Sequence, residues 1–145
     1  MDEPLIATLV SRFYARARHD PDLGPVFNGA IADWDHHLET LTAFWSALLL
    51  APERITGPRY KGNPMAAHLK HLERMTPALF DRWLALWSQT TAEVLPPPAA
   101  ADAMAKAARI ATSLQLGLFY RPAACPHSSP AHISRGTAPC RSPSR

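Results

Sequence analysis

The sequence contains no long hydrophobic stretch. No apolar run approaches the ~18 residues that a transmembrane helix needs, so no membrane span is expected. The first ten residues, MDEPLIATLV, are acidic and have no basic region ahead of their short apolar run, which is a poor match to a signal peptide. These two absences predict a cytoplasmic protein that does not associate with membranes.

Cysteine and glycine are scarce, and their scarcity excludes several chemistries. The two cysteines, Cys125 and Cys140, form neither a disulfide framework nor a zinc motif, and no C-x-x-C-H sequence exists that would attach a c-type haem covalently. The sequence also lacks H-E-x-x-H and the glycine-rich motifs that bind phosphate groups. Metalloprotease and nucleotide-binding functions are therefore not expected.

The positive charge is concentrated at the C-terminal end. The formal net charge is +3, but residues 121–145 contain four arginines and no acidic residue, so residues 1–120 carry a charge of about −1. A nearly neutral domain gives little support for nucleic-acid binding. The segment RPAACPHSSPAHISRGTAPCRSPSR has five prolines and few core-forming residues. We therefore expect one domain over residues 1–120, followed by a disordered Pro/Ser/Arg-rich tail over residues 121–145.

Hydrophobic residues recur at helical spacing, and no alternation typical of strands stands out. Helices are predicted over residues 4–19, 33–50, 64–73, 76–95 and 99–119, separated by breakers such as Asp20-Pro21 and Pro96-Pro97-Pro98. Residues 21–33 are expected to form short turns. The predicted fold class is all-α.

Two histidines have positions that favour an interior site. With Trp34 as reference at 100° per residue, His37 lies at about −60°, on the edge of the apolar face, whereas His36 lies at about 200°, toward solvent. In the short helix, His68 lies beside an inner face formed by Met65, Leu69 and Leu72, and His71 is rotated further away.

A histidine placed like His68 can bind iron through Nε2 while its Nδ1–H donates to a backbone carbonyl. The same patterns also fit ordinary hydrogen-bonded core histidines. A zinc site from His68 and His71 lacks clear third and fourth ligands.

Tyr14 and Trp83 lie at the inner faces of their helices. Such residues are commonly core aromatics, but a buried Tyr O–H and Trp N–H need hydrogen-bond acceptors. A gas ligand that becomes negatively charged when it binds iron is such an acceptor. Two such bonds would slow its release by about 10²–10⁴-fold, at about 1.4 kcal/mol per decade. This favours ligand chemistry or sensing over oxygen delivery.

These features occur in four motifs: FYARARHDPDLGPVF, DWDHHLETLTAFWSALLL, YKGNPMAAHL and LFDRWLALW. Over about residues 5–120 the chain resembles the bacterial group III truncated haemoglobins. The resemblance implies a two-over-two helical sandwich, a haem b cofactor and the ligands O₂, CO and NO. It makes His68 the iron ligand and assigns the rest of the haem pocket to Tyr14, Phe27, His37, Leu41, Phe44, Trp45, Tyr60 and Trp83.

The resemblance also implies a choice of roles, among them nitric oxide detoxification and peroxide or redox chemistry. Turnover as an NO dioxygenase or peroxidase would need a separate reductase, because no flavin or nicotinamide domain is recognisable. The chain departs from the family pattern in a short segment before Trp34, a long loop APERITGPRY and the extra tail. The alternative hypothesis is a cofactor-free helical interaction module, which would not bind hemin.

Overall fold

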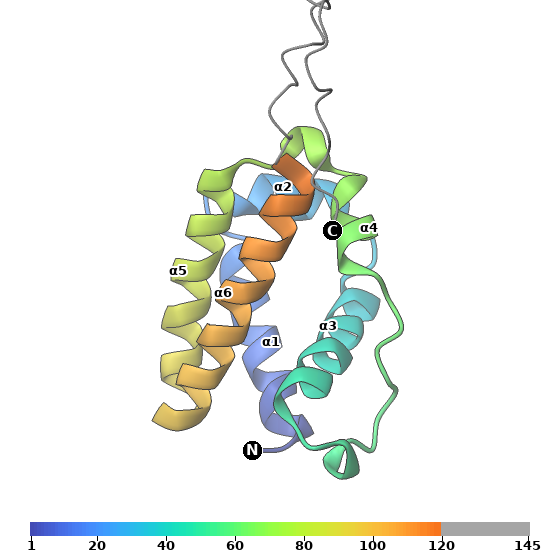
Figure 1. Cartoon of the computed structure of the whole chain (residues 1–145), viewed down its shortest axis with the longest axis vertical. Helices are drawn as coiled ribbons and strands as arrows, with labels where there is room; N and C mark the ends of the chain where they lie inside the picture. Colours follow the sequence, from blue (N-terminus) through green and yellow to red (C-terminus); the bar gives the residue numbers. More distant parts are fainter. Residues whose placement is uncertain (120–145) are drawn as a thin grey trace, which may run out of the picture.

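The computed structural model describes residues 1–119, and every regular element in that range is helical (Figure 1). The predicted all-α class is therefore confirmed, whereas the predicted tail, with Cys125 and Cys140, lies outside the described residues. Within residues 1–119 no helix is both long and apolar enough to cross a membrane. The elements are α1 (Glu3–Ala17), α2 (Leu23–Ala30), α3 (Trp34–Leu49), η1 (Pro52–Arg54), α4 (Pro64–Leu69), η2 (Leu72–Arg74), α5 (Pro77–Val94) and α6 (Pro97–Phe119).

Four long helices form two layers. Helix α1 packs against α3, and α5 packs alongside α6 over much of its length (Figure 1). Contacts of α1 with α5 and of α3 with α6 join the two pairs into a two-over-two sandwich. The short helices α2 and α4 pack against α5 and α6, respectively, near one end of the sandwich.

The helix starts agree with the predicted starts because the sequence supplies capping side chains. The Asp33 carboxylate accepts from His36 N, the Asn63 amide oxygen from Ala66 N and the Thr76 hydroxyl from Leu79 N. Each of these caps satisfies an amide that has no partner within its helix. Helix α6 begins at Pro97, two residues earlier than predicted, because a proline in the first turn needs no amide hydrogen-bond partner.

Residues 23–30 form a helix where the sequence predicted only turns. Leu23 is buried, and Gly24 lies so close to the end of α1 that a Cβ atom there would be 2.7 Å from the Arg18 carbonyl oxygen. This close approach lets an eight-residue helix pack where propensity alone gives a weak signal. Tertiary contact therefore determines the structure of this segment.

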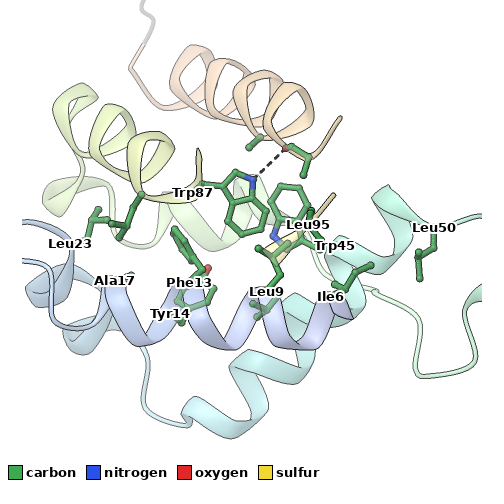
Figure 2. Close-up of a cluster of buried hydrophobic side chains, with 14 residues drawn as sticks. Ile6, Leu9, Phe13, Tyr14, Ala17, Leu23, Trp45, Leu50, Trp87 and Leu95 are labelled. Carbon is green, nitrogen blue, oxygen red and sulfur yellow. Dashed lines mark hydrogen bonds between the residues drawn. The ribbon is translucent and has the colours of Figure 1, made fainter. Parts of the chain in front are cut away.

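The core is built on stacked aromatic rings. Trp87 is fully buried, stacks on Trp45 with centroids 4.3 Å apart, and meets Phe13 edge-on at 5.1 Å (Figure 2). Its indole N–H donates to the Ala103 carbonyl at 3.3 Å, so its polar group is satisfied. Ala103 and Ala107 are both fully buried on α6, which allows α5 and α6 to approach closely.

The loop between α3 and α4 is fixed to the start of α1. Glu3 Oε1 accepts from the Thr56 amide at 2.9 Å and from the Thr56 hydroxyl at 2.7 Å, and Glu3 Oε2 accepts from the Gly57 amide at 3.0 Å. These bonds, led by that of the Thr56 hydroxyl, hold the pKa of Glu3 below its usual value. The long loop noted in the sequence is therefore attached at its midpoint, and its later residues border the site described below.

A buried carboxylate joins the end of α1 to α5. The Asp20 side chain, 2% exposed, accepts from Arg82 at 2.6 and 2.7 Å and caps α2 by accepting from Leu23 N at 2.9 Å. We expect Asp20→Asn to lower the free energy of unfolding by about 2–3 kcal/mol, because the variant loses charge-assisted hydrogen bonds at a buried position. The loss is not larger because the guanidinium of Arg82 can still be hydrated. Urea denaturation at pH 7 measures this change.

The same pair predicts a pH dependence. The hydrogen bond from Arg82 is the main cause that lowers the pKa of Asp20 in the folded state. The stabilisation is therefore present above the unfolded-state pKa and is lost as the pH falls through the lower folded value. The gap in unfolding free energy between wild type and Asp20→Asn should therefore shrink as the pH falls below the ordinary pKa of an aspartate. Glu93→Gln, at a more exposed ion pair with Arg16, is the control and should change stability much less. An equal loss in both variants contradicts the prediction.

Candidate functional site

A cavity of about 410 Å³ lies between the two helical layers and α4. Its size is in the range typical of small-molecule and cofactor sites. The structure places all nine sequence-predicted site residues on its wall: Tyr14, Phe27, His37, Leu41, Phe44, Trp45, Tyr60, His68 and Trp83. They come from α1, α2, α3, the loop before α4, α4 itself and α5.

His68 is oriented by the helix that carries it. Its Nδ1 lies 2.6 Å from the carbonyl oxygen of Pro64, one turn earlier in α4. A carbonyl can only accept, so Nδ1 carries the proton and Nε2 of the neutral ring keeps a free lone pair. The half-buried ring lines the cavity. This tautomer is the one that a histidine needs to bind a metal through Nε2.

The prediction was wrong for two neighbours of His68, whereas Met65 and Leu72 pack inward as predicted. Leu69, predicted on the inner face, is 49% exposed, and His71, predicted to point away, lines the cavity. For His71 the reason is that α4 ends at Leu69, and His71 leaves the helical region with φ −119° and ψ 24°. The 100° rotation per residue that placed His71 therefore no longer applies, whereas Leu69 is still within α4 and lies on its exposed side. The structure brings two histidines, not one, to this part of the wall.

His37 lies in the first turn of α3, while its neighbour His36 is exposed as predicted. His37 Nε2 is buried and has no hydrogen-bond partner among residues 1–119. Desolvation, with smaller effects from the charges of His36 and His68, lowers the pKa of His37. The ring is therefore neutral at pH 7, and its unpartnered nitrogen gives the site a free polar group.

Tyr14 and Trp83 complete the polar side of the cavity. Tyr14 is 5% exposed, and its ring meets Phe27 at 5.4 Å and His37 at 5.3 Å, both edge-on. Burial raises the pKa of its hydroxyl, which therefore stays protonated at neutral pH. Trp83 lies parallel to Trp87 with centroids 6.0 Å apart. Both side chains line the cavity, and each has one hydrogen-bond donor group.

The remaining wall is mostly apolar. Phe44 meets Trp45 at 5.4 Å and Tyr60 at 5.0 Å, both edge-on, so α3 and the following loop share one aromatic surface. Burial raises the pKa of Tyr60, which keeps its hydroxyl protonated. An apolar wall with a few free polar groups suits a flat, mainly hydrophobic ligand.

Sequence reasoning missed several cavity residues. Besides His71, the wall includes Thr40, one turn after His37, and a group from the later part of the chain: Met75, Leu79, Phe80, Ile110, Ala111 and Leu114. Ala111 and Leu114 lie on the buried, apolar face of α6. The helical spacing could have suggested the group, but not which part of that face borders the cavity.

No described group of side chains could bind a metal ion unaided. Within residues 1–119 no three His, Cys, Asp or Glu side chains lie close enough together. The zinc alternative considered for His68 and His71 therefore gains no support. A single histidine with a free Nε2 instead suits a metal that brings its other ligands with it.

Comparison with known proteins gives two matches and one negative result. The chain is 33% identical over 94 residues to the group 3 truncated hemoglobin ctb of Campylobacter jejuni, an alignment that covers 62% of this chain and 69% of that protein. The fold is similar to the crystal structure of a group III truncated hemoglobin from the same organism, with a TM-score of 0.71, 30% sequence identity and coverage of 82% of this chain and 92% of that one. No protein-family model matches the chain.

Proposed function

Since this chain belongs to the group III truncated haemoglobins, we propose that its cavity binds one haem b and that O₂, CO and NO bind reversibly to the haem iron. One observation carries the proposal: His68 presents a free Nε2 to an apolar cavity whose wall also contains Tyr14, Trp83 and the unpartnered His37. Haem supplies an iron atom with an open coordination position at which a diatomic gas can bind.

His68 is the residue that would hold the iron. The bond from its Nδ1 to the Pro64 carbonyl fixes the ring and makes Nε2 a better electron donor. The macrocycle is apolar and flat, which suits the aromatic and aliphatic wall formed by Phe27, Leu41, Phe44, Trp45 and Tyr60. Burial of this surface would supply most of the binding free energy.

Tyr14 and Trp83 are the donors that would stabilise a gas ligand with negative charge. The raised pKa of Tyr14 keeps its hydroxyl protonated at neutral pH, so it remains a donor. His37 is neutral at pH 7 and can offer one further donor or acceptor nitrogen. Several donors at one ligand favour tight O₂ binding over rapid exchange, and so NO or redox chemistry over bulk oxygen transport.

Catalytic turnover with NO or peroxide would need electrons from outside the site. The sequence has no recognisable flavin or nicotinamide motif that would supply them. The proposal therefore includes a separate reductase or a small reductant as a partner.

The direct test is a hemin titration of the purified protein followed by visible spectroscopy. We expect a Soret band that saturates at one hemin per chain and shifts after reduction and addition of CO. Iron-free protoporphyrin is the control, since it should occupy the same cavity without a CO-dependent shift. Absence of a stoichiometric band would instead support the cofactor-free helical module.

A further inference from the structure

An exposed arginine covers the outer face of Trp34. The guanidinium carbon of Arg18 lies 4.3 Å from the centre of the Trp34 ring, a cation–π contact. Arg18 is the C-cap of α1, and Trp34 is the first residue of α3, so the contact joins the end of one helix to the start of another. Neither residue lines the cavity.

Asn28 on α2 fixes the arginine in this position. Arg18 Nε donates to Asn28 Oδ1 at 3.3 Å, and Asn28 Nδ2 donates to the Arg18 carbonyl at 3.1 Å. Gly24, one turn earlier on α2, makes this pairing possible because it lets α2 lie directly against the Arg18 carbonyl. We refer to Arg18, Asn28 and Trp34 together as the latch.

The inner side of the latch contacts the cavity residues. The Trp34 ring meets His37 edge-on with centroids 5.5 Å apart, and lies 5.9 Å from the ring of Tyr14. His37 is in the first turn of α3, the part of a helix that opens most readily. No hydrogen bond among residues 1–119 holds His37 Nε2, and the rings of Trp34 and Tyr14 pack edge-on against the imidazole.

We propose that the latch positions His37, because Arg18 and Asn28 hold Trp34 against the imidazole and so keep it inside the cavity. Arg18 and Trp34 are thus positioning residues that act through His37 on the rate at which a gas reaches the site. The first part of this inference, that the latch positions His37, concerns only the protein chain. The second part, the effect on the rate at which a gas reaches the site, rests on the proposed haem function. A cation–π contact at an exposed site changes an equilibrium about two- to fivefold, which sets the scale of the expected effects.

Chemical modification tests the first part without haem. Diethyl pyrocarbonate acylates accessible imidazole nitrogens, and mass spectrometry gives the rate at each histidine. We expect Arg18→Ala and Asn28→Ala to raise the rate at His37 about two- to fivefold. The rate at the exposed His36 should not change, and it serves as the internal reference. Arg12→Ala, an exposed arginine on the same helix, is the control variant and should behave like wild type.

Conservative replacement separates positioning from charge alone. Arg18→Lys keeps the positive charge but loses the planar group that stacks on Trp34 and bonds to Asn28. We expect its His37 modification rate to lie between those of wild type and Arg18→Ala. If Arg18→Ala and Asn28→Ala, both folded by circular dichroism, leave His37 as protected as in wild type, the latch does not position it.

Gas kinetics test the second part. In hemin-loaded, reduced protein, Arg18→Ala should raise the CO association rate about two- to fivefold after flash photolysis. The same substitution in a His37→Ala background should have no further effect, because the residue through which the latch acts is gone. An equal change in both backgrounds refutes action through His37. Failure of every variant, wild type included, to bind hemin refutes the haem function and leaves the modification result to decide on the latch.

Discussion

Replacement of His68 by glycine is expected to remove the iron ligand and to lower the affinity for hemin by more than about 100-fold. Loss of a residue that only supports a metal ligand typically costs 10–100-fold in affinity, and loss of the ligand itself should cost more. Hemin titration followed at the Soret band measures the effect.

The glycine variant also allows a rescue experiment. Removal of the side chain leaves space beside α4, and free imidazole added in solution can occupy it and supply a nitrogen ligand. We expect the wild-type spectrum to return as the imidazole concentration rises. A merely destabilised chain would not respond in this way.

His71→Ala is the matched control for this prediction. His71 lies three residues from His68 and lines the same cavity, but no hydrogen bond fixes its ring among the described residues. We expect this variant to keep the spectrum and hemin affinity of wild type. The opposite pattern, with His71→Ala losing the band and His68→Gly keeping it, assigns the ligand to His71.

The long helices could be predicted because local signals and periodicity agree there. Asp33 and Thr76 cap the helices that the apolar spacing predicts, and both starts fall within one residue of the structure. The inward position of His37 and outward position of His36 follow from the same rotation, since α3 is regular over its whole length. A regular helix preserves the angular relation between residues, so the sequence suffices.

Prediction failed where tertiary contacts determine the backbone. Helix α2 forms because Gly24 permits contact with the Arg18 carbonyl, a contact between segments that no local pattern reports. The chain leaves α4 after Leu69, and this change of conformation turned His71 into the cavity. In short elements a one-residue difference in helix length rotates every later side chain by about 100°.

The cavity residues likewise include some that could be predicted from the sequence and some that could not. Tyr14 and Trp83 were identified from their inner-face positions and the family motifs, and both lie on long helices that bring them to the cavity wall. Phe80 and Ile110 were missed because their helices have apolar residues on a wide face, only part of which borders the cavity. The spacing of residues gives the face, but the position of the cavity on it depends on how α4 and α6 pack.

Tyr14→Phe is expected to speed the release of O₂ from the hemin-loaded protein by about 10- to 100-fold. A hydrogen bond to a charged acceptor contributes about 1.5–3 kcal/mol, and about 1.4 kcal/mol corresponds to a factor of ten. The substitution removes only the hydroxyl, so the ring contacts with Phe13 and Phe27 remain. Stopped-flow displacement of O₂ by CO measures the rate.

Trp83→Phe should act in the same direction, and the double variant should approach a 10²–10⁴-fold increase if the two bonds contribute independently. Trp87→Phe is the control, because its indole N–H is already bound to the Ala103 carbonyl on the side away from the cavity. Trp87→Phe should lower stability with little effect on O₂ release. Because CO is a weaker hydrogen-bond acceptor than O₂, the rate of CO release should be similar in wild type and in all variants.

The rate of O₂ release from the hemin-loaded wild-type protein should also be nearly constant between pH 7 and pH 9. Burial raises the pKa of Tyr14, so its hydroxyl remains protonated and continues to donate throughout this range. Desolvation lowers the pKa of His37, so that ring remains neutral over the same range. Neither side chain therefore changes its charge at the site. Fast O₂ release from wild type, unchanged by Tyr14→Phe and Trp83→Phe, would show that the free donors in the cavity do not act on the gas, and would favour oxygen delivery over the redox chemistry proposed above.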